Sequence, residues 1–354
     1  SLKFTRCLSD TCTYIRKSRN NKPIIVAIFV DDIIILYDKK DEQEWLKYKD
    51  KFMKQFKMKD LNNAEWILGI RITRDRILKT IKLDHEVQIN KTLEAFHMSQ
   101  CNPAGTPSEL KKLTREDSPK TQQQRQEMSK IPYKSLIGSL QYIALSTRPD
   151  IAYAVNQLSR FLSDPGQQHW LAGKRVLRYL KGTTKSSLLY KDYDQNRSSR
   201  IEVFCDADWA GDLDDRKSTT GIVIKLNGCT IVWLSKKQSI VALSTAEAEY
   251  IAIATAVQEV IWINQYLSEL NLNDSETPII RSDNQAAIQI ASNDTLHNRS
   301  KHIDIRYHFI RQIVREGGVI ITYVGTKQQE ADINTKGLSV STFKQLRDKM
   351  MVQR

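Results

Sequence analysis

The chain has 354 residues, of which 40% are hydrophobic and 27% are charged, and its formal net charge is +13. This composition is ordinary for a globular protein, and the length allows more than one domain at roughly 100–200 residues each. No apolar run approaches the ~20 residues of a membrane helix, so no membrane partner is expected. The first residues contain neither an initiator Met nor an apolar signal segment. We therefore predict an intracellular protein, cytoplasmic (particle-associated) or nuclear, whose start is a cut in a longer chain.

Positive charge is concentrated in the first part of the chain. Residues 1–200 hold 37 Lys and Arg against 22 Asp and Glu, whereas residues 201–354 hold 17 against 19. A basic surface attracts polyanions, which favours a nucleic-acid partner over the alternative of a merely soluble basic surface. The five cysteines form no C-x-x-C pair, so no zinc knuckle is expected.

The first elements predicted along the chain are a hairpin and a helix. Residues 24–37 are two β-branched apolar runs around Asp31 and Asp32, which predicts a strand–turn–strand unit with both acids at the turn. Aromatic residues at helical spacing predict a helix over 42–58. The polar stretch 102–130 contains three prolines and is interpreted as a linker or mobile loop.

Two helices are expected after this polar stretch. Pro149 begins the first, and Asp164-Pro165-Gly166 ends it. The second runs over 167–181, and positive charge lies along it. Its basic residues are candidate contacts to nucleic-acid phosphates, namely Lys174, Arg175 and Arg178.

From residue 201 the pattern changes to α/β. Three strands, a long helix, a strand, two helices, a last strand and short helices follow one another, and Asn227-Gly228 is a strong hairpin signal. That order is typical of an RNase H-like fold, a mixed five-stranded sheet with flanking helices. The expected strands are 201–205, 219–226, 229–235, 278–281 and 319–324, and the expected helices are 245–270, 284–292 and 303–316.

Four acidic residues at the ends of these elements carry the predicted chemistry. Asp206 ends the first strand, Glu249 lies in the first turns of the long helix, Asp283 ends the fourth strand and Asp332 begins the helix after the last strand. An isolated acid at a strand end is usually a turn or cap residue, but four in this order can converge on one pocket. Their oxygens suit Mg²⁺, with Mn²⁺ as a substitute. Two such ions about 3.5–4 Å apart can activate water and stabilise the leaving oxygen in phosphodiester cleavage.

Neighbouring acids have structural explanations. Ser244 and Glu247 fit a capping box at the start of the long helix, so Glu249, which points to another side of the helix, is the predicted ligand. The role of Asp208 is left open. Solvated surface is the interpretation for three acids of the loop before the second strand, Asp212, Asp214 and Asp215.

Motifs along nearly the whole chain resemble those of the Ty1/copia family of retrotransposon Pol proteins. In the first part they are Phe29-Val30-Asp31-Asp32, Trp66-Ile67-Leu68-Gly69-Ile70, Gly138-Ser139-Leu140-Gln141-Tyr142, Thr147-Arg148-Pro149-Asp150-Ile151 and Arg178-Tyr179-Leu180-Lys181-Gly182. In the last part they are Asp206-Ala207-Asp208-Trp209-Ala210-Gly211, Ser244 to Tyr250, Ser282-Asp283-Asn284-Gln285, Lys301 to Arg311 and Ala331-Asp332. The resemblance implies RNase H catalysis by the four acids already named.

The same resemblance implies that Asp31 and Asp32 are metal-binding acids of a reverse-transcriptase palm. Phe29 stands where that motif usually has Tyr. In the family, the third palm acid and the fingers lie on an upstream region that is missing here. We therefore expect no DNA synthesis by this chain alone.

Two further departures flank the last acid. Asn334 and Gly337 stand where the family usually has Leu and Pro. Glycine in a helix interior costs about 1 kcal/mol, so we expect these changes to loosen the helix of Asp332, as in a decaying copy.

The sequence thus predicts a partial palm over 1–75, a thumb-like segment with a polar linker over 76–135, a connection over 136–198 and an RNase H domain over 199–354. The expected activity is endonucleolytic cleavage of RNA in RNA–DNA hybrids, with hybrid and template–primer as partners. One alternative is a catalytically dead remnant that only binds nucleic acid. Another is an integrase or transposase nuclease, whose last acid is typically a Glu on a late helix, whereas here it is Asp332.

Overall fold

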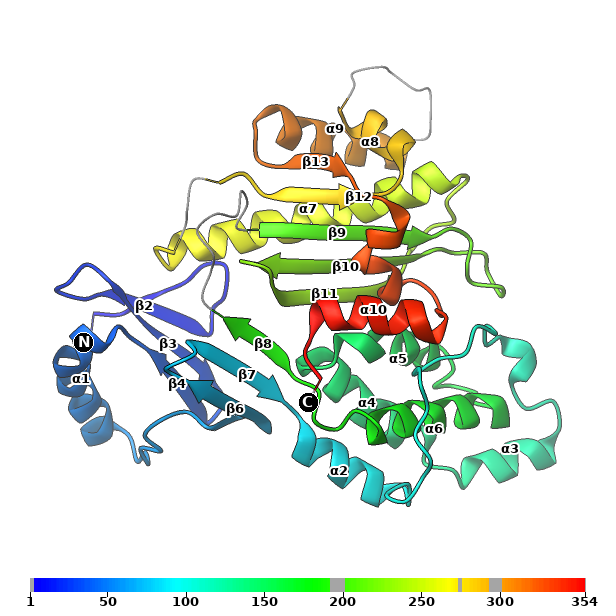
Figure 1. Cartoon of the computed structure of the whole chain (residues 1–354), viewed down its shortest axis with the longest axis horizontal. Coiled ribbons are helices and arrows are strands. Elements are labelled where there is room, and N and C mark those ends of the chain that lie inside the picture. The colour runs from blue at the N-terminus through cyan, green and yellow to red at the C-terminus, as the bar shows by residue number, and fades with distance from the viewer. Residues whose placement is uncertain (1–2, 192–200, 273–275, 293–300, 354) are drawn as a thin grey trace. The chain divides into compact units, whose positions relative to one another are not determined.

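The structure is a computed structural model that describes residues 3–191, 201–272, 276–292 and 301–353, with the backbone alone over 301–307 (Figure 1). The chain divides into two compact units. One comprises Ser1–Leu68 and Gln258–Ser275, and the other comprises Gly69–Val257 and Glu276–Arg354. None of the described helices combines the length and the apolar character of a membrane-spanning segment.

The first unit contains an antiparallel sheet of order β1-β2-β3-β4, with strands β1 (Thr5–Arg6), β2 (Thr13–Lys17), β3 (Pro23–Phe29) and β4 (Asp32–Leu36). Helix α1 (Glu42–Gln55) follows η1 (Lys39–Asp41) and buries Trp45, in line with the predicted aromatic spacing. The unit also holds β5 (Trp66–Ile67) and the second half of α7 (Thr245–Glu269). The Glu269 carboxylate accepts hydrogen bonds from the backbone N–H groups of Leu8 and Ser9, which ties this helix end to the start of the chain.

Strands β3 and β4 form the hairpin predicted over 24–37. Phe29 pairs with Asp32, so the turn consists of Val30 and Asp31 alone. Val30 has a φ of 52°, in the left-handed region, which is uncommon for a β-branched residue. Asp31 and Asp32 are exposed at the tip of this hairpin.

The second unit begins with a small antiparallel sheet and a layer of helices. Strands β6 (Ile70–Asp75), β7 (Thr80–Asp84) and β8 (Leu188–Lys191) are neighbours in this sheet. The helices are α2 (Glu86–Ala95), α3 (Gln122–Ser129), α4 (Tyr133–Ser146), η3 (Pro149–Ile151), α5 (Ala152–Ser159) and α6 (Gln167–Lys181). Leu140 of α4 and Leu177 of α6 are fully buried in their shared apolar core. Of the two predicted helices, the second coincides with α6, whereas the first is split into η3 and α5.

The polar stretch 102–130 is packed against other elements of this unit. It contains η2 (Arg115–Asp117) and α3, and Thr106 within it is buried. Lys112 Nζ donates hydrogen bonds to Asp208 Oδ2 at 2.9 Å and to the Gly211 carbonyl oxygen at 2.8 Å. The stretch interpreted as a linker or mobile loop is therefore held by contacts within this unit, while the polar linker and the four domain boundaries stay predictions.

A mixed five-stranded sheet of order β11-β10-β9-β12-β13 forms the last part of the second unit (Figure 1). Strands β9 (Ile201–Asp208), β10 (Thr219–Leu226) and β11 (Cys229–Lys237) are antiparallel, whereas β12 (Ile279–Ser282) is parallel to both β9 and β13 (Ile320–Tyr323). Asn227 and Gly228 have φ values of 53° and 75°, as the predicted hairpin turn requires. This strand order defines the RNase H-like fold expected from the sequence.

Helical segments follow and flank this sheet. They are the first half of α7, α8 (Gln285–Ser292), α9 (Lys301–Arg315), η4 (Thr326–Gln328), η5 (Glu330–Asn334) and α10 (Val340–Met350). The sheet interior is apolar, with Val203, Ile222 and Ile280 fully buried. Segment η5 lies against β9 and β10. Asp332 therefore lies within a short 3-10 helix, where a helix start was predicted.

Candidate metal centre

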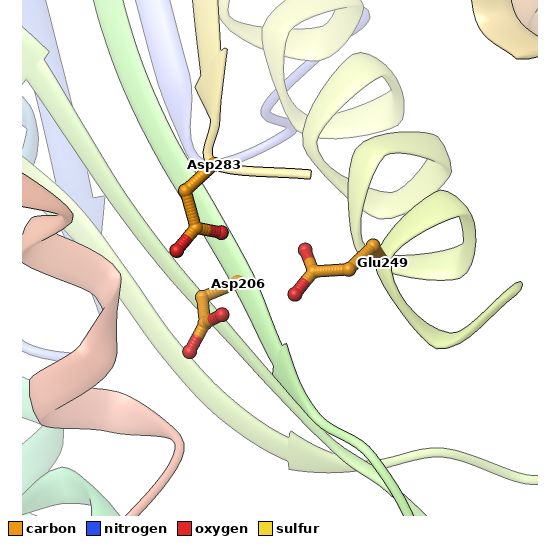
Figure 2. A group of neighbouring side chains, drawn as sticks. All are labelled: Asp206, Glu249 and Asp283. Atoms are coloured by element: carbon orange, nitrogen blue, oxygen red, sulfur yellow. The ribbon is translucent and has the colours of Figure 1, made fainter. Parts of the chain in front are cut away.

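The register of two parallel strands brings Asp206 and Asp283 together. Strands β9 and β12 pair with Phe204 opposite Arg281. Asp206 lies two residues beyond Phe204, and Asp283 lies two residues beyond Arg281, just past the end of β12, so both reach the same level near the carboxyl ends of these strands. Their side chains lie next to one another there (Figure 2).

Glu249 reaches the same place from the first turns of α7. Its Oε1 accepts a hydrogen bond from the Ala207 backbone N–H at 3.3 Å, which joins the helix to β9. One carboxylate oxygen from each of Asp206, Glu249 and Asp283 lies within 4.8 Å of the others (Figure 2). We call these residues the three-acid centre.

Glu247, the other candidate acid of this helix, caps the start of α7. Ser244 Oγ accepts a hydrogen bond from the Glu247 backbone N–H at 3.2 Å. The Glu247 carboxylate accepts one from the Leu243 N–H at 2.8 Å, one residue before the expected partner. Because Glu249 is two residues further along the helix, its side chain faces the strands.

Burial makes the three-acid centre unfavourable without a cation. Burial and then the negative charge of Asp206 raise the pKa of Glu249 to about 10. Glu249 Oε2 is buried and has no hydrogen-bond partner among the described residues. A hard divalent cation is bound by clustered carboxylate oxygens of this kind, so the residues present fit Mg²⁺.

Asp332 lies beside the three-acid centre. Burial, and then the charge of Asp206, raises the pKa of Asp332 to about 7. Within the described part of the chain, its carboxylate does not join the three others in a common group of candidate ligands. Its Oδ1 instead lies 2.8 Å from Lys336 Nζ. The four acids predicted from the sequence are thus arranged as three together and one adjacent.

Two residues of this site were not predicted from the sequence. Thr335 Oγ1 donates a hydrogen bond to Asp206 Oδ2 at 2.6 Å, and Lys336 Nζ lies 3.9 Å from the same oxygen. Burial disfavours the lysine charge, but Asp206 and Asp332 outweigh burial and raise the pKa of Lys336. A signal was present, since Lys336 follows Asp332 by four residues, a spacing typical of helical ion pairs.

Polar contacts attach η5 to the sheet. Gln329 Nε2 donates a hydrogen bond to the Cys205 carbonyl oxygen at 2.9 Å. Lys225 on β10 and Glu330 form a buried ion pair at 2.6 Å. A Cβ at Gly221 on β10 would stand 2.6 Å from a carbonyl oxygen of η5, so the close crossing requires glycine there.

The two departures from the family pattern fit this packing, and the expectation that they loosen a helix is wrong. Asn334 is fully buried, and its Nδ2 donates a hydrogen bond to the Ile222 carbonyl oxygen at 3.1 Å. Gly337 lies outside any helix, because η5 ends at Asn334. A Cβ at position 337 would stand 2.5 Å from the Glu109 carbonyl oxygen. The backbones approach so closely that glycine is favoured.

The loop after β9 is more buried than predicted. Asp212 is 3% exposed and forms ion pairs with Arg160, at 2.5 Å, and with Lys237. The prediction of a solvated side chain is therefore wrong for Asp212, because two cations approach it. Asp208, whose role was left open, pairs with Lys112 at 2.9 Å. The predicted exposure is confirmed for Asp215, whose side chain is 43% exposed, whereas the Asp214 side chain is 16% exposed and pairs with Arg160.

Asp31 and Asp32 belong to the first compact unit. Both are exposed, and among the described residues no third acid joins them in a group of candidate ligands. A metal-binding role for this pair stays a prediction.

Two of the three candidate basic contacts are engaged within the chain. Arg175 forms an ion pair with Glu109 at 3.1 Å, and Arg178 Nε donates a hydrogen bond to the Asn102 carbonyl oxygen at 2.8 Å. The Lys174 ammonium lies 5.8 Å from the centroid of an indole ring. Contact of these three residues with nucleic acid stays a prediction.

Comparison with known proteins places this chain in a family. Residues 1–110 match the family model described as reverse transcriptase (RNA-dependent DNA polymerase). The chain is 40% identical over 344 residues to the retrovirus-related Pol polyprotein from transposon TNT 1-94 of Nicotiana tabacum, covering 97% of this chain and 25% of that protein. It is 31% identical over 262 residues to a putative transposon Ty5-1 protein of Saccharomyces cerevisiae, covering 69% of this chain and 76% of that protein.

A solved structure of LC11-RNase H1, isolated from compost, is 16% identical to this chain with a TM-score of 0.31. The matched region covers 38% of this chain and 92% of that protein. The strand order of this chain, and not this similarity, defines its RNase H-like fold.

The family-model match and the strand order define a protein of the reverse-transcriptase family with an RNase H-like fold. The chain belongs to the Ty1/copia-type Pol family, with relatives that include the tobacco and yeast transposon proteins. It spans 25%, 23% and 23% of the length of three curated Pol polyproteins that it matches.

Proposed function

We propose that residues 199–354 hydrolyse the RNA strand of an RNA–DNA hybrid in a reaction that requires a divalent cation. The observation that carries this proposal is the convergence of Asp206, Glu249 and Asp283 at the carboxyl ends of β9 and β12. Membership of the Pol family supports it, because that family combines reverse transcriptase with RNase H.

The acids would hold Mg²⁺, with Mn²⁺ as a substitute. Asp206, Glu249 and Asp283 would hold one ion, and Asp206 together with Asp332 would hold a second. When bound, Mg²⁺ would supply activation of a water molecule and stabilisation of the leaving oxygen of the cleaved phosphodiester. The chain orients the ligands through Thr335, whose hydroxyl is bound to Asp206, and through the Ala207 N–H, which is bound to Glu249. Such orientation matters because a misplacement of about 1 Å can cost on the order of 100-fold in rate.

The basic first part of the chain would bind the hybrid through phosphates. Residues 1–200 carry the excess positive charge, with 37 Lys and Arg against 22 Asp and Glu. Phosphate contacts position a duplex without reading its sequence. Groove shape and 2′-hydroxyl groups would distinguish a hybrid from DNA.

We also propose that this chain alone does not synthesise DNA. Asp31 and Asp32 would be two palm acids, and no third acid in the described part of the chain accompanies them. Nucleotide incorporation on a primed template by the purified chain would contradict this proposal.

Cleavage of a labelled RNA–DNA hybrid in Mg²⁺ tests the RNase H proposal. We expect the wild-type chain to cleave, EDTA to abolish cleavage and Asp206→Asn to reduce it by at least about 100-fold, because a ligand should matter at least as much as the residues that orient ligands. Asp215→Asn is the matched control, since Asp215 is an exposed acid on the loop after the same strand.

Equal cleavage by Asp206→Asn and wild type would contradict the proposed centre. Binding of the hybrid without cleavage, by a folded wild-type chain, would instead support the alternative of a dead nucleic-acid-binding remnant.

A further inference from the structure

Lys336 places a positive charge inside the acidic site. Its Nζ lies 2.8 Å from Asp332 Oδ1 and 3.9 Å from Asp206 Oδ2. Its side chain is 37% exposed, whereas those of Asp206 and Asp332 are 6% and 9% exposed. The ammonium group therefore enters from solvent and ends between two largely buried carboxylates.

Asp206 has different neighbours on its two sides. Glu249 and Asp283 lie on one side and supply carboxylate oxygens. On the other side, Asp206 Oδ2 accepts a hydrogen bond from Thr335 and faces Lys336. Lys336 thus supplies a protein cation on the Asp206–Asp332 side.

We propose that Lys336 acts as a built-in competitor for the second metal ion. In the nucleic-acid-free chain, its ammonium occupies the Asp206–Asp332 side, so that a divalent cation binds tightly at the three-acid centre alone. The second ion binds after Lys336 leaves, and the phosphate of a bound hybrid favours this exchange by adding oxygen ligands and negative charge. This inference rests on the proposed function, and it makes Lys336 a positioning residue that couples metal occupancy to substrate.

The chemistry of lysine suits such an exchange. Its ammonium is a compact, strongly hydrated charge on a flexible four-carbon chain, so it can leave the carboxylates for water or for a phosphate at little steric cost. The side-chain amides of Gln329 and Asn334 donate hydrogen bonds to carbonyl oxygens of β9 and β10, and these bonds keep Asp332 in place when the lysine moves.

Titration calorimetry with Mn²⁺ on the full chain, without nucleic acid, tests the proposal. We expect one tight ion for wild type and two for Lys336→Met, with the second bound at least about tenfold more tightly than in wild type, because a charge-assisted contact no longer competes. Lys327→Met is the matched control, since Lys327 is exposed in η4 and should leave Mn²⁺ binding unchanged. With an uncleaved hybrid present, the difference in affinity for the second Mn²⁺ ion between wild type and Lys336→Met should shrink.

Equal Mn²⁺ stoichiometry and affinity in wild type and folded Lys336→Met would overturn the role of Lys336 and leave the proposed hydrolysis intact. No Mn²⁺ binding by any of these chains, together with no hybrid cleavage, would overturn the proposed function and this inference with it.

A measurement on the wild-type chain covers the case in which Lys336→Met does not fold. Acetylation of Lys336, measured by mass spectrometry relative to Lys327, should accelerate when Mn²⁺ is raised until it displaces the ammonium group from Asp206 and Asp332. An unchanged labelling ratio at metal saturation would overturn the proposal.

Discussion

Two glycines of the second unit, Gly337 and Gly138, differ in the space available for a side chain. A Cβ at Gly337 would lie 2.5 Å from the Glu109 carbonyl oxygen, whereas a Cβ at Gly138, exposed on α4, would meet nothing within 4 Å. We predict that Gly337→Ala lowers the free energy of unfolding by about 1–3 kcal/mol through overpacking. Gly138→Ala, its control, should raise it by about 1 kcal/mol, since alanine favours a helix interior. Urea denaturation measures both, and a Gly337→Ala chain as stable as wild type would contradict the close approach.

His85 gives the chain a defined dependence on pH. It is fully buried, and its Nδ1 lies 2.8 Å from Thr147 Oγ1. Burial lowers the pKa of His85 to about 4, from 6.5. The unfolded chain therefore takes up this proton at a higher pH than the folded chain. The contribution of neutral His85 to the free energy of unfolding is fully present above pH 6.5 and is lost as the pH falls toward 4. The loss from this residue approaches about 3 kcal/mol.

The measurement is the stability difference between wild type and His85→Gln, taken at pH 7 and at pH 5. The difference should shrink at pH 5, because only wild type must keep a buried imidazole neutral. Other titrating groups are shared by both chains and cancel. A difference that stays constant would show that His85 is not the group responsible.

Between elements, a buried ion pair joins η3 to the end of α6. The side chains of Arg148 and Asp150 are 0% exposed, and Arg148 Nε and Nη2 contact the two carboxylate oxygens at 2.9 and 2.8 Å. Arg148 Nη1 donates a hydrogen bond to the Thr183 carbonyl oxygen at 2.9 Å, and the Tyr179 hydroxyl donates one to Asp150 at 2.5 Å. The guanidinium thus links segments that are distant in sequence.

We predict that Arg148→Met lowers the free energy of unfolding by about 3–5 kcal/mol, because it leaves a buried carboxylate without its cation. The double variant Arg148→Met/Asp150→Leu should recover part of that loss. Asp164→Ala is the control, since its pair with Arg125 is exposed and should contribute less than about 1 kcal/mol. Thermal and urea unfolding give these values, and equal losses in the single and the double variant would argue against an uncompensated charge.

Over the whole molecule, charge is divided along the chain and not spread evenly. Residues 1–200 hold 37 Lys and Arg against 22 Asp and Glu, whereas residues 201–354 hold 17 against 19. We predict that hybrid binding weakens at least about tenfold between 50 and 200 mM salt, because phosphate contacts release counterions. Fluorescence anisotropy with the Asp206→Asn chain measures binding without cleavage. Binding that is independent of salt would exclude an electrostatic grip.

Elements with a strong local signal were predicted well from the sequence. The hairpin around Asp31, helix α6 and the Asn227-Gly228 turn follow from periodicity and turn chemistry, which depend on neighbours in the chain. The RNase H-like sheet was also predicted from the sequence, because few folds are compatible with this succession of strands and helices. Helix ends were less accurate, as in the early end of α1 at Gln55.

The order of the acidic residues along the chain was enough to select four candidate ligands, Asp206, Glu249, Asp283 and Asp332. In an RNase H-like fold, the elements that carry them end at one edge of the sheet. Only the tertiary structure separated Asp332 from the other three and placed Thr335 and Lys336 beside Asp206. It also reversed the expectations for Asp212 and Gly337, because burial and backbone approach depend on partners distant in sequence, Arg160 and Glu109. Local residue patterns determine which elements form, whereas contacts between distant segments decide which charges meet.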